Sequence, residues 1–258
     1  MAHKTLISGT AYSVTGGREL IGGTGYGCKA GKTLIGGTAF TVPFAKGIPL
    51  STITPGAILY LNESGSPVPF YIAKHDYESG LNSAGRTLVV RKDCYDMRAF
   101  NTEAKNTYNG SALDTFLNGT YLQKLSTKLQ EIIKTTKFYY TPGLLDSSIK
   151  TLERAVFQLS INELGKTADN ASKEGTKLPI ASMLQIAKRN GSAVAQWTRS
   201  PNTYPDRDWA TYICYVGING SGNSMGLYST KFGSRPAFTL PATTAVIANA
   251  DGTYTLAA

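Results

Sequence analysis

Residues 197–238 have a composition that suits neither a regular helix nor a regular strand. We expect a structural role for the two ends, which are residues 197–201 (Trp-Thr-Arg-Ser-Pro) and 233–238 (Gly-Ser-Arg-Pro-Ala-Phe). The stretch between them is rich in Tyr, Asn, Ser and Gly and has little periodicity. Large rigid aromatics and small flexible residues supply contact area at a low entropic cost, as in binding surfaces. We therefore expect a recognition surface held between two structural ends, although single aromatics could instead fill an irregular core.

The composition favours a β-rich, loop-rich protein. The chain has 258 residues, of which 27 are Gly and 15 are Tyr, and this length accommodates one large domain and a small module. The net charge is +9, but the Lys and Arg residues are scattered rather than clustered. The pattern does not indicate a nucleic-acid partner. A basic surface could instead steer the protein toward an anionic cell envelope.

The cysteines and the start of the chain bear on its compartment. Cys28, Cys94 and Cys214 are odd in number and far apart, which predicts reduced, mostly buried thiols without a disulfide framework or metal site. The N-terminal residues lack the apolar region of a signal peptide, and no run is long enough for membrane insertion. We expect synthesis in a reducing cytosol, exit by a route such as lysis if the protein acts outside the cell, and no cofactor.

Three similar units stand at the N-terminus. They are residues 5–12 (TLISGTAY), 19–26 (ELIGGTGY) and 33–40 (TLIGGTAF), so their starts at 5, 19 and 33 are 14 residues apart. Each unit predicts two short strands joined by a glycine turn. Such short units cannot bury a face alone, which indicates an assembly or docking module over residues 1–46. The glycines do not indicate a phosphate loop, because neither a Lys-Ser pair nor a helix follows them.

Residues 47–55 are expected to be a linker, and residues 56–258 to form the main domain. Alternating apolar residues and turn signals predict strands, while capping residues and apolar stripes predict helices. The expected strands are 57–61, 68–75, 86–91, 138–140, 155–159, 244–249 and 253–256, and the expected helices are 111–118, 122–133, 160–165 and 180–187. The pattern predicts an α+β domain with short antiparallel strands and two to four helices.

Four motifs, in this order, resemble those of one family. They are 111–118 (SALDTFLN), 156–164 (VFQLSINEL), 197–201 (WTRSP) and 234–240 (SRPAFTL). Together they resemble the C-type-lectin-like domains of bacterial and phage proteins, which share a fold with the formylglycine-generating enzyme and with retroelement-diversified phage tropism determinants. The N-terminal repeats resemble, more loosely, modules of predicted prophage tail proteins.

The resemblance implies a scaffold that displays a variable ligand-binding segment, here residues 202–231. The candidate contact residues are Tyr204, Arg207, Trp209, Tyr212, Tyr228 and Lys231. The scaffold would include Trp197, Arg199, Arg235 and Phe238, with both guanidinium groups tying loops through forked hydrogen bonds. The Asn-rich composition fits diversification at adenine-rich codons. The resemblance implies a phage tail protein, a homotrimer by analogy, that joins tail components through its repeats and binds a bacterial surface receptor, glycan or protein.

Two features of related proteins are missing. The calcium motifs of sugar-binding animal lectins do not occur, and Asp206 and Asp208 are the only carboxylates in 202–231, too few for a calcium cage. The paired cysteines of the formylglycine-generating enzyme are also missing, since Cys214 stands alone in its region. The sequence therefore predicts neither calcium-dependent sugar binding nor that enzyme's chemistry.

Two alternatives to a phage receptor-binding protein stay open. One is a bacterial adhesin or other lectin-like binder, and the other is a surface-polysaccharide hydrolase. A hydrolase would need a carboxylate pair, for which Glu153, Glu163, Asp206 and Asp208 are available. However, Glu163 is better explained as a cap and Glu153 as a solvated helix residue. His75, at a strand end, is more typical of an ordinary surface histidine than of a general base, so we expect no enzyme.

Overall fold

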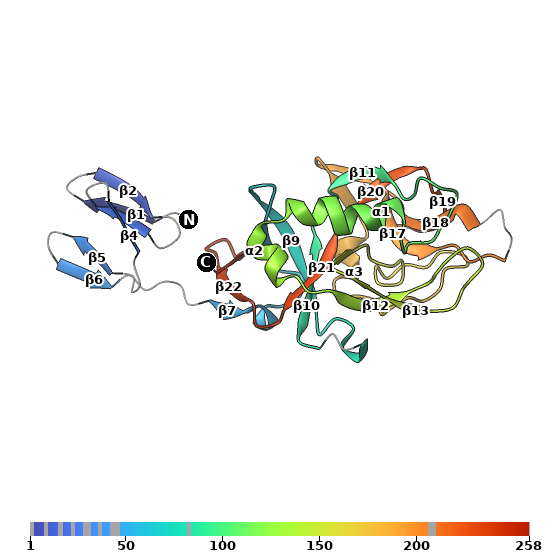
Figure 1. Cartoon of the computed structure of the whole chain (residues 1–258), viewed down its shortest axis with the longest axis horizontal. Helices are drawn as coiled ribbons and strands as arrows, with labels where there is room; N and C mark the ends of the chain where they lie inside the picture. Colours follow the sequence, from blue (N-terminus) through green and yellow to red (C-terminus); the bar gives the residue numbers. More distant parts are fainter. Residues whose placement is uncertain are drawn as a thin grey trace.

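The computed structural model describes residues 3–7, 10–14, 18–21, 24–27, 32–35, 38–41, 47–81, 84–205 and 210–257, with side chains from residue 47 onward except those of Met225 and Leu227. The N-terminal units each form the two antiparallel strands that the sequence predicts (Figure 1). These strands are β1 (His3–Ile7), β2 (Thr10–Val14), β3 (Arg18–Ile21), β4 (Thr24–Gly27), β5 (Lys32–Ile35) and β6 (Thr38–Thr41). A Gly-rich turn between two short apolar-and-Thr segments is sufficient local information for such a hairpin.

The largest element is an eight-stranded mixed sheet with the order β14-β21-β10-β9-β8-β23-β22-β7. Its strands are β7 (Ile48–Pro49), β8 (Ile58–Glu63), β9 (Ser66–His75), β10 (Arg86–Arg91), β14 (Val156–Phe157), β21 (Ala237–Pro241), β22 (Ala245–Ala248) and β23 (Tyr254–Leu256). The predicted hairpin β8–β9, the strand β10 and the C-terminal hairpin β22–β23 are confirmed. Strand β23 pairs in parallel with β8, whereas the other pairs in this sheet are antiparallel.

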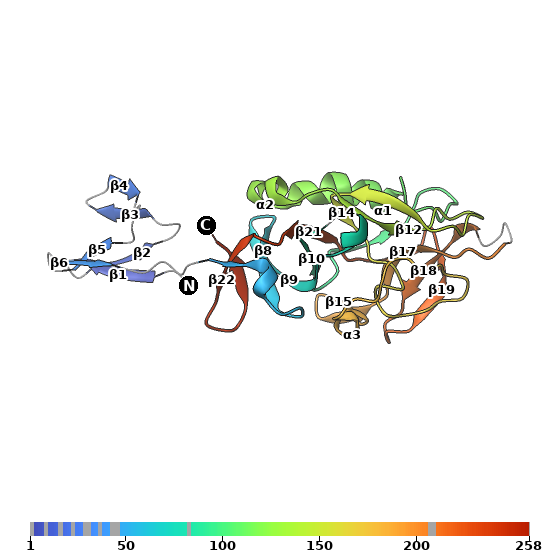
Figure 2. The same cartoon turned by 90° about the horizontal axis from the view of Figure 1, so that it is seen from below.

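A second sheet of five strands, with the order β11-β20-β17-β18-β19, carries most of the segment of interest. Its strands are β11 (Asp96–Ala99), β17 (Gln196–Pro201), β18 (Tyr212–Val216), β19 (Gly222–Leu227) and β20 (Lys231–Ser234). Two further hairpins are formed by β12 (Thr136–Tyr140) with β13 (Lys150–Arg154), and by β15 (Ala187–Arg189) with β16 (Ser192–Val194). In Figures 1 and 2 the five-stranded sheet lies at the end of the domain away from β7 and β22.

The helices are short, and the expected α+β fold class is wrong: the part of the chain that the structure describes is mostly β. Its three α-helices are α1 (Ala112–Phe116), α2 (Thr127–Ile132) and α3 (Ala181–Leu184). The π-helical turn η3 (Leu117–Tyr121) and the 3-10 turns η1 (Leu50–Thr52), η2 (Ser79–Leu81) and η4 (Leu122–Lys124) complete the helical segments. By contrast, the described residues form 23 strands, β1 to β23.

Tertiary contacts explain why the predicted helices are shortened. Ser111 caps α1, as predicted, by accepting a hydrogen bond from the Asp114 amide, but the helix changes to a π-turn at Leu117. Leu125 forms a β-bridge with Glu63, which interrupts the predicted helix over 122–133. The expected helix over 160–165 is a turn. Leu113, Leu125 and Leu129 of the predicted apolar stripes are buried, whereas Met183 is 45% exposed. At Leu125, backbone pairing with a neighbouring strand determined the conformation.

One core joins the two sheets and the helices. It contains fully buried aromatic residues from distant parts of the chain, among them Phe70, Phe138, Phe157 and Phe238. The rings of Phe138 and Phe157 are 4.5 Å apart between centroids, and those of Phe70 and Phe238 are 5.4 Å apart. Leu50 and Ile53, in the range expected to be a linker, are also buried in this core.

Candidate functional site

The two ends that flank the display segment, residues 202–231, are buried. Every residue of β17 (Gln196–Pro201) is buried, and so is every residue from 233 to 240. Strands β17 and β20 lie side by side in parallel, with Gln196 opposite Gly233. The segment between them therefore starts and ends on adjacent strands, which fixes both of its ends in the core.

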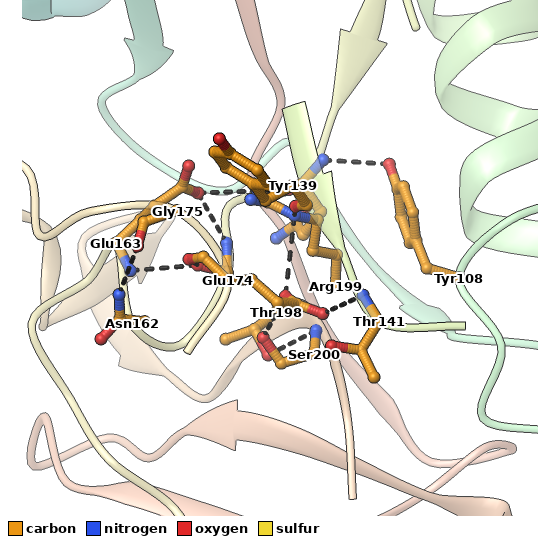
Figure 3. Close-up of polar contacts among 12 residues, drawn as sticks. Tyr108, Tyr139, Thr141, Asn162, Glu163, Glu174, Gly175, Thr198, Arg199 and Ser200 are labelled. Carbon is orange, nitrogen blue, oxygen red and sulfur yellow. Dashed lines mark hydrogen bonds and ion pairs between the residues drawn. The ribbon is translucent and has the colours of Figure 1, made fainter. Parts of the chain in front are cut away.

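Arg199, on β17, is the centre of a buried polar network (Figure 3). Its Nε donates to the carbonyl oxygen of Tyr139 (2.9 Å), and its Nη1 donates to the Gln158 carbonyl (3.0 Å) and to Glu163 Oε2 (2.7 Å). Glu174 Oε2 lies 3.7 Å from Nε. Burial alone would lower the pKa of the Arg199 guanidinium, but the charges of Glu163, Tyr77 and Glu174 outweigh it and raise this pKa. The guanidinium is thus held charged while it contacts two backbone carbonyls and two carboxylates.

The two carboxylates of this network make further hydrogen bonds. Glu163 accepts from the Tyr77 hydroxyl (2.6 Å) and from the Ser160 amide (2.8 Å), and its own amide donates to Ser160 Oγ (3.0 Å). This reciprocal pair confirms the predicted cap, although it closes a turn rather than a helix. Glu174 accepts from the Thr141 amide (2.6 Å) and from Ser200 Oγ (2.7 Å). Burial raises the pKa of Glu174 above its ordinary value.

Arg235 performs the same structural task at the other end of the segment. Its Nε donates to the Arg91 carbonyl (2.9 Å), its Nη1 to the Leu184 carbonyl (2.8 Å), and its Nη2 to the Lys92 carbonyl. Because the guanidinium is buried, its pKa is lowered from the usual value. The predicted roles of Trp197, Arg199, Arg235 and Phe238 as buried scaffold residues are confirmed.

A row of aromatic rings runs across the five-stranded sheet. Phe100 contacts Trp197 (5.5 Å between centroids), Trp197 contacts Phe232 (4.6 Å), and Phe232 contacts Tyr215 (4.5 Å). The first two rings are fully buried and the last two are half-buried. A Cβ atom on Gly226 would lie 2.7 Å from the Trp197 ring, so the indole requires glycine at this position. Tyr215, within the display segment, thus extends the core, as the alternative interpretation allowed.

The candidate contact residues differ in exposure. Tyr204 follows β17 and has 43% of its surface exposed, while Lys231 begins β20 opposite Ala99 and is exposed. Tyr212 begins β18 and is half-buried. Tyr228 is half-buried and packs against the core. Arg207 and Trp209, like Asp206 and Asp208, lie outside the described residues.

Two features in or beside the display segment were not predicted from the sequence. Ile218, in the turn between β18 and β19, has 63% of its surface exposed, but no periodicity distinguishes it from a core residue. Residues 101–110 lie beside the display segment, because Asn106 Nδ2 donates to the carbonyls of Asn202 (2.8 Å) and Tyr212 (3.1 Å). The Asn101 amide also donates to the Tyr228 carbonyl (3.0 Å). No sequence signal predicted these contacts across the chain.

The residues weighed for catalysis have structural environments. Glu163 is fully buried beside Arg199, and Glu153 is exposed on β13 opposite Lys137, on a strand rather than the expected helix. His75 is half-buried, with Nδ1 2.9 Å from Thr87 Oγ1 and Nε2 2.7 Å from the Ile53 carbonyl. Because a carbonyl oxygen only accepts, the proton is assigned to Nε2.

Two further properties concern the described residues alone. Cys94 and Cys214 are free and buried, as predicted, and burial raises the pKa of Cys94 to about 11 and that of Cys214 further. In the described part of the chain, no three His, Cys, Asp or Glu side chains are arranged to hold a metal ion. Nor does any described helix have the length and apolar character needed to cross a bilayer.

Comparison with known proteins places the segment in a family. The model of a family described as a domain of unknown function, DUF6273, matches residues 84–242, more than half of the 258 residues. The chain belongs to DUF6273. The matched range includes both buried ends, the Arg199 and Arg235 contacts and all of the display segment. No curated protein and no solved structure matches the chain.

Proposed function

We propose that this chain is a receptor-binding protein of a phage tail, which recognises a bacterial surface receptor through the display segment, residues 202–231. One observation carries the proposal: residues 196–201 and 233–240 are buried throughout, whereas the segment between them includes exposed positions. Tyr204, Ile218 and Lys231 are exposed, and they combine an aromatic, an aliphatic and a cationic side chain. A rigid frame that carries such a mixed segment is the arrangement expected of a binding surface.

The position of the segment also supports this function. Strands β18 and β19 lie at one end of the domain, and β7, the first strand after residues 1–46, lies at the other (Figures 1 and 2). A receptor could thus approach the display segment without obstruction from the chain entering at β7. In the proposal, the three N-terminal hairpins join the protein to tail components and to its own copies in a trimer, because units this short need a partner surface to bury.

Charge gives the proposal a second line of support. The net charge of +9 is attractive to anionic cell envelopes, and Lys231 places one positive charge on the display segment itself. Steering of this kind increases the rate of encounter, whereas the aromatic contacts determine which receptor is bound.

Binding of the labelled full chain to whole cells tests the proposal, with a panel of bacterial strains as the ligand. The test variant changes the candidate contacts Tyr204, Arg207, Trp209 and Lys231 to Ser. The control variant changes Leu145 and Lys134 to Ser, because both are exposed and lie outside the segment. We expect strain-restricted binding that the control retains and the test variant loses by at least about 100-fold, since central aromatic or Arg contacts each contribute about 2 kcal/mol or more.

Folding must be verified before binding is interpreted. Circular dichroism and thermal unfolding should be the same for both variants and the unchanged protein, because the altered candidate residues lie outside the buried ends. Equal binding by two folded variants would refute the assignment to residues 202–231. Binding that is uniform across strains and removed by salt would indicate nonspecific attraction by charge and would also contradict the proposal.

A further inference from the structure

A surface hollow lies outside the display segment, between residues 101–110 and the helical segment formed by α1 and η3. Its volume is about 840 Å³, which is within the range of roughly 300–1,000 Å³ of small-ligand sites. Most of its polar lining consists of hydroxyl and amide side chains: Thr102, Thr107, Asn109, Thr115 and Thr120. The hollow is therefore concave and predominantly uncharged.

The hydrogen-bonding groups of this lining fall into two sets. The deeper groups are used within the protein, because Ser111 Oγ accepts from the Asp114 amide and Asn101 Oδ1 accepts from the Thr102 and Ala112 amides. The four threonine hydroxyls, in contrast, form no hydrogen bond with another described residue. Asn109 uses its Oδ1 to accept from Arg154, which leaves its amide nitrogen available. Five groups that can bond a ligand thus converge on one hollow.

Apolar surface accompanies these groups. Leu144, with 41% of its surface exposed, lines the hollow together with the half-buried ring of Phe116, one face of which is covered by the Arg98 guanidinium. Each threonine adds a methyl group beside its hydroxyl. A pyranose has the matching character, with hydroxyl groups around its edge and C–H groups on its faces.

The charges in the hollow cancel. Its charged lining residues are Glu103 and Lys105, whose side chains form an ion pair of 2.6 Å. The hydrogen bond and the positive charge of Lys105 lower the pKa of Glu103, so this carboxylate is charged at neutral pH and the two formal charges of the pair sum to zero. Although the whole chain carries +9, no free cation in this lining would favour an anionic ligand over a neutral one.

We propose that this hollow binds an uncharged saccharide residue. The threonine hydroxyls and the Asn109 amide bond the sugar hydroxyls, and Leu144 contacts a C–H face of the ring. This inference goes beyond the proposed function, because the hollow is formed by residues outside 202–231. Residues 101–110 form one wall and also contact the display segment through Asn106, so a saccharide bound here would lie next to that segment.

Saturation-transfer NMR on the full chain tests this site, with defined sugars as probes. The neutral probes are methyl glycosides of glucose, galactose, mannose, rhamnose, N-acetylglucosamine and N-acetylgalactosamine, and the acidic probes are glucuronic and sialic acid. The variant Thr115→Val/Thr120→Val removes two exposed hydroxyls and retains the side-chain shape. Thr243→Val is the matched control, because Thr243 is also exposed but does not line the hollow.

We expect at least one neutral glycoside to bind, with affinity reduced about tenfold or more in the double variant, as the loss of two hydrogen bonds implies. Affinity in the control should be unchanged. Three results would overturn the proposal: no binding by any neutral probe, binding by the acidic probes alone, or equal affinity in the double variant. Since the assay uses free sugars rather than cells, its failure would leave the whole-cell test of residues 202–231 unaffected.

Discussion

Replacing Arg199 with Met should destabilise the fold in a pH-dependent way. The substitution removes a fully buried cation and its hydrogen bonds to Tyr139, Gln158 and Glu163, and leaves Glu163 and Glu174 buried without their counter-ion. Breaking a buried ion pair by deleting one partner costs about 3–5 kcal/mol. The Ser160, Tyr77 and Thr141 donors remain in place, so we expect the lower half of that range, about 3–4 kcal/mol at pH 8.

The sign of the pH effect follows from the carboxyl groups. Burial already raises the pKa of Glu174, and the Arg199 charge opposes that rise. Without Arg199 the pKa of Glu174 rises further, so the folded variant binds a proton more tightly than the unfolded chain does. A carboxyl with a raised pKa in the folded state adds stability below its unfolded pKa and loses it as the pH increases through the folded pKa. The difference in the free energy of unfolding between the variant and the unchanged protein should therefore be smaller at pH 5 than at pH 8.

Urea unfolding monitored by tryptophan fluorescence, at pH 8 and pH 5, measures both effects. Arg199→Lys, which keeps the charge but not the forked geometry, is a milder variant for use if Arg199→Met does not fold at pH 8. A second comparison, Arg199→Met with Glu163→Gln, should recover part of the lost stability by removing an unpaired charge. A loss below about 1 kcal/mol at pH 8, or an equal loss at both pH values, would refute the assignment of Arg199 as the counter-ion of this network.

Two other predictions concern packing and thiol chemistry. Gly226→Ala should lower the free energy of unfolding by about 1–3 kcal/mol, because the added Cβ overpacks the Trp197 ring. The control Gly80→Ala, where a Cβ meets nothing within 4 Å, should change the free energy of unfolding by less than about 0.5 kcal/mol. Equal urea midpoints for the two variants would contradict the close contact. In a Cys28→Ser background, Cys94 and Cys214 of the folded protein should not react with a thiol reagent at pH 8, because burial raises their pKa values. Both thiols should react after unfolding in urea. Rapid reaction of the folded protein would contradict this prediction and show that one of these sites opens.

Local signals in the sequence predicted local structure well. The strand pairs of the repeats, the hairpin β8–β9 and the C-terminal hairpin depend on residues close in sequence, and the structure contains all of them. The cap at Ser111 is also local and was predicted, but the end of its helix was not, because the helical segment changes to a π-turn at Leu117. The overestimate of helix content arose there and at Leu125, where pairing with Glu63 prevails over an apolar stripe.

Contacts between distant residues were not predictable from one sequence. Glu174 resembles any surface carboxylate in its sequence context, and only the fold brings it to Arg199, Ser200 and Thr141. The scaffold role of Arg199 was inferred from a motif resemblance, whereas its partners were not. Similarly, Tyr228 was selected as a contact residue for its type, and the fold packs it partly against the core. Residue type indicates what a side chain can do, but exposure depends on the whole chain.

The organisation of the buried ends explains how the display segment could vary without loss of the fold. Arg199 and Arg235 bond backbone carbonyls of Tyr139, Gln158, Arg91 and Leu184, all outside residues 202–231. Their stabilising contacts therefore do not depend on which side chains the segment carries. Exposed substitutions away from packed features typically change stability by less than about 0.5 kcal/mol, so Lys231, which is exposed, can be exchanged at little cost. Gly226 and Tyr215 cannot, because they pack on the aromatic row, and variation in a receptor-binding role should be confined to the exposed positions.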